Sequence, residues 1–122
     1  MKSAAINITL RNIRNLGRDV VFKQYPSNEL GEVQYDKEPI EILIFGIYHE
    51  SSTTRALTTA DGGTVYSAST PMLLTEFKST QNLQRFAECS IGGEMFKVVS
   101  IVDIEQSGQI ADIVLERVQG NV

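Results

Sequence analysis

The fold is decided by residues 85–102, which read RFAECSIGGEMFKVVSIV. β-branched, aromatic and apolar residues recur on both sides of Gly92 and Gly93, and two glycines between two strand patterns favour a two-residue hairpin. Both central positions of such a turn need a positive φ, which glycine adopts without steric cost. This stretch therefore predicts two antiparallel strands joined by a tight turn.

Further strand patterns flank this hairpin. A second turn at residues 106–109 precedes the apolar run 110–118, and strand patterns upstream cover residues 18–25, 40–48 and 72–77. Short strands at regular spacing, with no long amphipathic helix, indicate an all-β protein. We expect a small antiparallel β-barrel or sandwich with one long inserted loop, and a central strand at 40–48 that is buried for much of its length.

The N-terminal arm, residues 1–17, has two interpretations. Its alternating start is typical of a strand, whereas the spacing of Leu10, Ile13 and Leu16 before Gly17 is typical of a short helix with a glycine stop. Both remain open at this level.

The longest connection lies between the central strands, at residues 50–71. The stretch Ser51–Thr70 holds four serines, six threonines and three alanines, and Arg55 and Asp61 are its only charged residues. It is longer than the connections of a compact domain and has little apolar surface for a core of its own. We therefore expect a loop that is either disordered or functional.

Length and charge bound the class of protein. A chain of 122 residues forms one domain, and it contains no apolar run long enough to cross a membrane. The N-terminus lacks the pattern of a secretory signal, so we expect a protein made in a cytoplasm. The net charge of −4 divides unevenly, because residues 1–25 carry 5 − 1 = +4 and the remainder carries 6 − 14 = −8. A basic head on an acidic body suggests contact with an acidic surface, which another copy of the chain offers, more than with nucleic acid.

Catalysis is not favoured. The single histidine, His49, stands beside Glu50 and could orient a base for Ser51 or Ser52. Neighbouring residues on a strand point to opposite faces, so this pair should not converge, and a solvated histidine at a strand end is the preferred interpretation. The sequence predicts no catalytic residue.

Other reactive or ligand-binding residue types have plain structural interpretations. Cys89 alternates with Ala87 and Ile91, which indicates a small buried hydrophobe. Residues 61–63 read Asp-Gly-Gly without the lysine of a phosphate-binding loop, so a hairpin turn explains them better. Three acidic residues near the second hairpin fit no calcium loop and suggest a solvated sheet edge; they are Asp103, Glu105 and Asp112. We expect no cofactor and no metal.

The order of these segments resembles the head–tail connector proteins of long-tailed phages, particularly the head-completion or stopper family. The resemblance covers most of residues 18–118, and its clearest local feature is the hairpin CSIGGEMFKVVSI at 89–101 followed by a strand that ends in Glu-Arg-Val. The matching segments are Val20–Phe22, Ile42–Phe45, the long loop, Met72–Leu74, 89–101 and 113–118.

This resemblance implies a structural virion protein of the phage neck. Copies would form a six- or twelve-fold ring between a portal or adaptor protein and a tail protein, since head-to-tail interfaces close into rings. It implies no membrane contact and leaves room for non-specific contact with packaged DNA. The loop at 50–71 would point into the channel, with residues Ser51, Thr53, Arg55, Thr58, Asp61, Gly62, Gly63, Val65, Tyr66 and Ser69.

The composition of the loop suits a gate, because a gate needs few buried apolar groups and no strong affinity for phosphate. Its β-prone segment 64–66 could pair with neighbouring copies and gain backbone hydrogen bonds that an isolated monomer lacks. We expect a loop that is mobile in the monomer and more ordered in the ring.

The basic arm suggests a second contact. Arg11, Arg14 and Arg18 would reach acidic surface on a neighbouring subunit or connector, and the alternative is a solvated face. Two other functions stay open: a tail-terminator or tail-completion ring, which needs no such long loop, and a monomeric β-barrel that binds a peptide or ligand.

Overall fold

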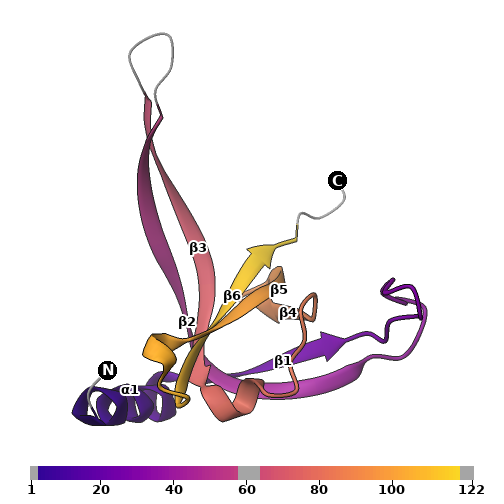
Figure 1. The fold of residues 1–122 in the computed structure, drawn as a ribbon, viewed down its shortest axis with the longest axis horizontal. Coiled ribbons are helices and arrows are strands. Elements are labelled where there is room, and N and C mark those ends of the chain that lie inside the picture. The colour runs from indigo at the N-terminus through magenta and orange to yellow at the C-terminus, as the bar shows by residue number, and fades with distance from the viewer. Residues whose placement is uncertain (1–2, 58–63, 119–122) are drawn as a thin grey trace.

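The computed structural model describes residues 3–57 and 64–118, with side chains for 4–51 and 69–118. The described strands form a closed antiparallel barrel in the order β1-β2-β3-β6-β5-β4, and one helix packs on its outside (Figure 1). The predicted β-barrel is therefore confirmed, and the N-terminal arm is a helix. The elements are α1 (Ser3–Leu16), β1 (Arg18–Gln24), β2 (Ile40–Leu57), β3 (Thr64–Glu76), β4 (Glu88–Ile91), β5 (Glu94–Asp103) and β6 (Ile110–Arg117), with short 3-10 helices at Phe77–Thr80 and Ile104–Gln106.

The barrel interior is filled by alternate residues of each strand. This follows from the two-residue period of a strand, which sends every second side chain to the same face. Large aromatic and branched side chains close the space, as in other small barrels. The central members are Val20, Phe22, Ile44, Leu73, Cys89, Phe96, Val98, Ile113 and Leu115.

Helix α1 covers part of the outer wall. Ile6 and Ile13 are buried and lie two turns apart on one face, which packs against β2, β3 and β6. Leu16 belonged to the predicted stripe but is 71% exposed. The helix ends at Gly17, whose N–H donates to the carbonyl of Ile13 at 2.9 Å. A Cβ at Gly17 would lie 2.5 Å from that carbonyl oxygen and 2.8 Å from the Phe45 ring, so glycine permits the close approach of helix to sheet.

The hairpin at 85–102 forms as predicted. Gly92 and Gly93 have φ of 60° and 83°, and Ile91 is paired with Glu94 across the turn. The first strand is shorter than its pattern suggests, because Phe86 has a left-handed φ of 72° and β4 begins only at Glu88.

The second hairpin also forms, with a correction. Gly108 has a φ of 70°, and its N–H donates to the Asp103 carboxylate at 2.9 Å. Asp112 was predicted on a solvated edge, and this is wrong, because β6 is paired with β3 on one side and β5 on the other.

The strand predicted at 40–48 is buried on one face only. Ile44 is fully buried, but Leu43 is 63% exposed and Val21, its register partner on β1, is 43% exposed. An apolar run cannot by itself distinguish a strand buried on both faces from one with an apolar outer face.

The prediction of a long loop at residues 50–71 is also wrong, because most of this segment is β-strand. β2 continues to Leu57 and β3 begins at Thr64, so the strands predicted at 40–48 and 72–77 are parts of one long hairpin. Serine and threonine give this segment no apolar alternation, yet threonine, valine and tyrosine favour extended backbone. The turn predicted at 61–63 lies outside the described residues.

Candidate functional site: the projecting hairpin arm

The outer halves of β2 and β3 leave the barrel as a two-stranded arm, residues 51–57 and 64–70. Register pairs run from Ser51 opposite Thr70 to Leu57 opposite Thr64. β1 follows β2 only as far as Gly46, and β6 joins β3 only from Met72 onward. In Figure 1 the arm rises well clear of the barrel. Along the described arm, both outer strand edges therefore lack a neighbouring strand.

The arm carries the predicted channel residues that fall in described backbone. Ser51 and Ser69 have described side chains, and both are exposed. Thr53, Arg55, Val65 and Tyr66 are placed by register, with Arg55 opposite Tyr66 and Val65 opposite Ala56. The remaining four, Thr58, Asp61, Gly62 and Gly63, lie outside the described residues.

Segment 64–66 does not depend on a neighbouring copy for all its backbone partners. It pairs with residues 55–57 of the same chain. The inner edge of this segment is therefore already paired, and the predicted pairing with neighbouring copies would use its outer edge.

The root of the arm is held by Arg117, at the end of β6. Its guanidinium donates to the carboxylate of Glu50 on β2, and its Nε donates to Glu94 Oε2 on β5 at 2.8 Å. Glu50 is opposite Pro71, the last register pair before the arm. One side chain thus ties three strands together where the arm leaves the barrel.

Aromatic residues of the barrel wall support this arginine. Arg117 lies over the Phe96 ring, with its Cζ 5.7 Å from the centroid. Tyr48 packs against Phe96 at a centroid distance of 5.7 Å, and Arg117 Nη2 donates to the Tyr48 hydroxyl at 3.4 Å. The planar guanidinium can serve two carboxylates and a ring face at once, which a lysine could not do.

The charges of the root lie close enough to shift their titration. The hydrogen bond from Arg117 holds the pKa of Glu50 below its ordinary value, with further hydrogen bonds from Tyr48 and Ser69. Burial raises the pKa of Tyr48, and the nearby Glu50 carboxylate raises it further. Glu50 therefore stays ionised and Tyr48 protonated, which is the state that keeps this network bonded.

Sequence reasoning missed Arg117, although a signal existed. Along β6, Arg117 has the same parity as Ile113 and Leu115, which fill the barrel. A charged residue at the end of an inward-facing row must leave the core at the mouth of the barrel, where it can meet carboxylates of adjacent strands.

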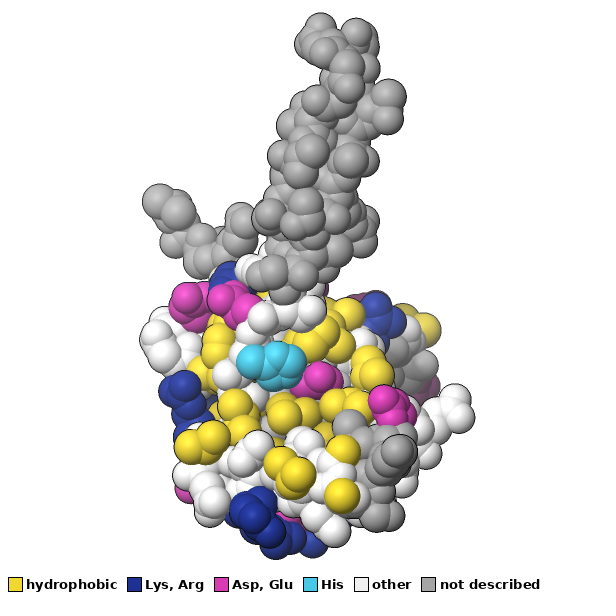
Figure 2. Space-filling view, turned by 90° about the vertical axis from the view of Figure 1, so that its left-hand side faces the viewer, with side chains coloured by type: hydrophobic (Ala, Val, Ile, Leu, Met, Phe, Trp, Pro, Cys, Tyr) yellow, Lys and Arg dark blue, Asp and Glu magenta, His cyan; other side chains and the backbone are white. Residues whose placement is uncertain are grey.

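His49 is partly exposed, as predicted, but it also has a carboxylate partner. Its Nε2 lies 2.7 Å from Asp112 Oδ1 across β3, and the His49 side chain is 38% exposed. Glu50 points to the other face, as predicted, and bonds to Arg117. Figure 2 shows apolar side chains gathered around the histidine on this outer face, which carries the half-buried Ile47, Met72, Leu74 and Val114.

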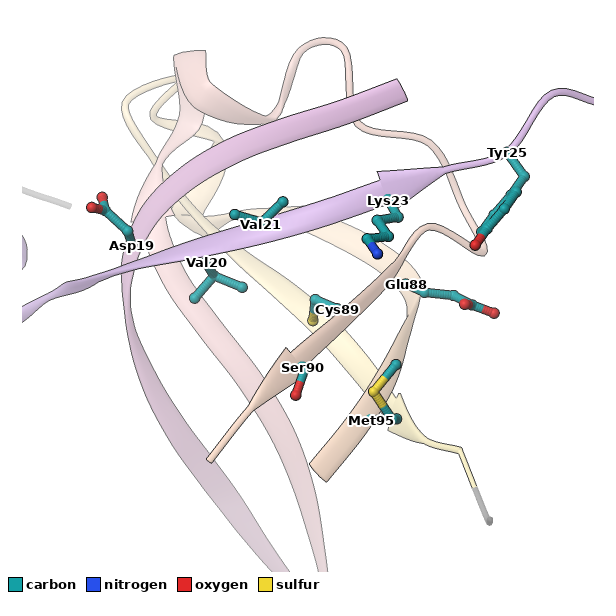
Figure 3. Close-up of a pocket in the computed structure, with 9 residues that line it drawn as sticks. All are labelled: Asp19, Val20, Val21, Lys23, Tyr25, Glu88, Cys89, Ser90 and Met95. Atoms are coloured by element: carbon teal, nitrogen blue, oxygen red, sulfur yellow. The ribbon is translucent and has the colours of Figure 1, made fainter. Parts of the chain in front are cut away.

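A groove of about 480 Å³ opens between β1 and β4. These strands share only two register pairs, Phe22 with Cys89 and Lys23 with Glu88. Lys23, Cys89 and Ser90 lie along the space between the strands in Figure 3. Cys89 is buried as predicted, and burial raises the pKa of its thiol to about 12, so it is an inert apolar group at this position.

The three predicted basic contacts are divided between two elements. Arg11 and Arg14 lie on α1 and Arg18 begins β1. Arg14 is 68% exposed and its Nε lies 3.7 Å from Glu76 Oε1. Arg11 and Arg18 are exposed and form no ion pair within the described residues.

Comparisons with known proteins give no family. No protein-family model matches the chain, and no curated protein is significantly similar to it. Among the described helices, none is long and apolar enough to cross a membrane.

Proposed function

We propose that this chain is a structural subunit of a phage neck ring, which joins a portal or adaptor to the tail and helps to close the DNA channel. The observation that carries the proposal is the arm, a two-stranded ribbon whose outer edges lack neighbouring strands along its described length. An isolated hairpin in water is marginal, whereas three or more paired strands are stable. Arms from adjacent copies in a ring would supply those strands.

The root of the arm supports the same function. Arg117 links the arm to β5 and β6, so the direction in which the arm leaves is set by the barrel wall. A gate element needs such a fixed base, because a free tether would not direct copies of the arm toward a common axis. The arm's serine, threonine and alanine side chains offer little attraction to phosphate, which allows DNA to pass once the gate opens.

Cryo-microscopy of particles of a tailed phage whose genome encodes this chain tests the proposal. We expect a ring of barrels between portal and tail, with the arms directed to the channel axis. A particle in which the chain is absent, or lies outside the neck, would refute it.

A shortened arm gives a functional test. Replacing Ser52–Ser69 with Asn-Gly closes the hairpin at Ser51 and Thr70 and leaves the barrel intact. We expect particles that package DNA but lose it before the tail attaches. The matched control is a substitution on the barrel wall away from the arm, such as Ser90→Ala. Full DNA retention by the shortened variant would contradict a gating role and leave only the joining role.

The groove between β1 and β4 favours a second candidate function, a monomeric barrel that binds an extended peptide. Two short, diverging strand edges can accept an added strand, and Val21 and Met95 supply exposed apolar contacts there. A selection from a random peptide library on the purified monomer tests it. We expect β-prone peptides whose binding is lost in Met95→Lys; peptides that bind this variant equally well would argue against the groove.

A further inference from the structure

Two surface features of opposite charge lie at opposite ends of the molecule. Helix α1 forms one end of the long axis in Figure 1, and the excursion between β1 and β2, residues 26–39, forms the other. The helix has basic residues and no acidic ones, whereas the excursion has four acidic residues and one lysine. They lie too far apart to meet within one copy, so a complementary contact between them would join two copies of the chain.

The outer face of α1 is an exposed surface of mixed character. Because Ile6 and Ile13 face the barrel, helical spacing turns Ile8 and Arg11 outward. Ile8 is 56% exposed, and Arg11, one turn further on, is also exposed. Arg14 lies on the flank of the same face, where its Nε is 3.7 Å from Glu76 Oε1 and its side chain stays 68% exposed. The helix therefore presents one exposed apolar side chain next to two arginines.

The tip of the excursion presents the complement. Leu30 is 83% exposed, the most exposed large apolar side chain in the described chain. Glu29 and Glu32 stand on either side of it, both exposed and without an ion pair among the described residues. Leu30 is complementary to Ile8, because both are apolar. The two carboxylates beside Leu30 are complementary to the two arginines near Ile8, because their charges are opposite.

The tip is a built turn. The Asn28 side-chain oxygen accepts hydrogen bonds from the N–H groups of Leu30 at 2.9 Å and Glu32 at 3.0 Å, and the Asn28 N–H donates to the Glu32 carbonyl at 3.0 Å. Leu30 is thus held in one backbone conformation before any partner arrives.

The base of the excursion is anchored to the barrel. The rings of Tyr25 and Tyr35 pack with centroids 5.1 Å apart, and Lys97 on β5 donates to the Tyr35 hydroxyl at 3.3 Å. Ser27 and Val33 form an isolated antiparallel β-bridge between the outgoing and returning halves of the excursion. Because the segment is already ordered, binding a partner through it would cost little conformational entropy, which favours its use as a binding element.

We propose that the Leu30 turn of one copy docks on the outer face of α1 of the next copy, with Leu30 against Ile8 and the two glutamates facing Arg11 and Arg14. The contact joins two different surfaces, so it is head-to-tail and propagates around a ring instead of closing as a two-fold dimer. It deepens the proposed function, on which it rests for the closure of the ring. The apolar pair supplies affinity, and the charges set register and speed of association.

Cross-linking of purified full-length chains tests the pairing directly. A chain with Ile8→Cys is mixed with one carrying Leu30→Cys under mild oxidation; the native Cys89 is buried and does not compete. We expect the mixed disulfide to exceed either homodimer by roughly tenfold, because only the mixed pair is brought together by the head-to-tail contact. The matched control replaces Leu30→Cys with Met95→Cys, another exposed apolar position on the barrel. Equal cross-linking of Ile8→Cys with both partners would overturn the proposal.

Charge reversal tests the electrostatic part. We expect Arg11→Glu to weaken self-association roughly tenfold at low salt, and Arg11→Glu with Glu29→Lys in one chain to restore it. Arg85→Glu changes the net charge by the same amount. Arg85 lies beside the acidic excursion, so this substitution makes the acidic partner more acidic and should not weaken its association with the arginines of α1. Association that survives Arg11→Glu unchanged would overturn the contact.

The failures of the two proposals can be told apart. A ring in the phage neck that tolerates Arg11→Glu and shows no Ile8–Leu30 proximity leaves the connector function standing and removes this contact. Head-to-tail cross-linking of a chain that is absent from the neck removes the connector function and leaves the contact.

Discussion

Arg117 donates a hydrogen bond to Glu50 across the mouth of the barrel, and so connects the last strand of the chain to the root of a hairpin formed nearly 70 residues earlier. The arm therefore does not hang from the barrel by its two strands alone. Its root is also bonded to one guanidinium, which in turn bonds to Glu94 and covers the Phe96 ring.

Arg117→Gln should loosen the root. The substitution removes the charge that two carboxylates share and leaves Glu50 and Glu94 to repel each other across the barrel mouth. We expect a lower urea midpoint with an unchanged m-value, and faster amide exchange at the arm root around Ser51 and Thr70 than in the wild-type protein. Arg85→Gln is the matched control, because Arg85 contacts one aromatic ring and, among the described residues, forms no ion pair with a carboxylate. Equal effects of the two substitutions would argue against a special role for Arg117.

The contribution of Glu50 should depend on pH in the acid range. Because hydrogen bonding to Arg117 lowers the pKa of Glu50 in the folded protein, its ionised form stabilises the fold above the unfolded-state pKa of about 4.3. That stabilisation is lost as the pH falls through the lowered folded-state pKa. We expect the gap in urea midpoint between wild type and Glu50→Gln to be constant above pH 5 and to shrink toward pH 3. A gap that widens on acidification would contradict this assignment.

Amide exchange along the arm should alternate in the monomer. In an antiparallel pair, every second residue bonds to the facing strand and the others direct their N–H groups to the open edge. We expect alternating protection over 51–57 and 64–70 in the isolated chain, and protection of the edge amides as well once rings form. Identical protection in both states would mean that the outer edges of the arm stay unpaired in the assembly.

Gly17→Ala should destabilise the junction of helix and barrel. The added methyl group would meet the Ile13 carbonyl at 2.5 Å and the Gly46 carbonyl at 3.0 Å, and backbone atoms cannot move aside cheaply. We expect a loss of about 1–3 kcal/mol in the free energy of unfolding, measured by urea denaturation. Ser90→Ala, at an exposed strand position, is the control and should change stability little. A neutral Gly17→Ala would show that α1 can shift on the barrel wall.

Turns and strand faces could be predicted from the sequence, because both depend on residues that are close together in the chain. The turn at Gly92 and Gly93 needs two positive φ values, and Cys89 follows the alternation of its strand; both predictions are confirmed. The sequence leaves helix and strand both open for residues 1–17, because Ile6, Ile8 and Leu10 alternate as in a strand, whereas Leu10, Ile13 and Leu16 have helical spacing.

The strands of the arm could not be predicted from local patterns. Alternation of apolar and polar residues arises where one face of a strand is buried against a core. Residues 51–57 and 64–70 lie beyond the register pairs that β1 and β6 make with β2 and β3, and serine and threonine recur there without a period that predicts strands. The pairing of Arg117 with Glu50 and of His49 with Asp112 was equally out of reach. These partners lie 67 and 63 residues apart, and only the strand order of the closed barrel brings them together.

The strand pairs that close the barrel differ in the number of register pairs they share. Under tension, the pairs with the fewest should separate first. A pull on the arm loads β2 and β3, which are fastened to β1 through seven register pairs and to β6 through five. The seam between β1 and β4 has only two. Tension would part that seam first and uncurl the wall into an open sheet, while the arm kept both of its attachments. The chain could thus yield under load without releasing the hairpin that bears it.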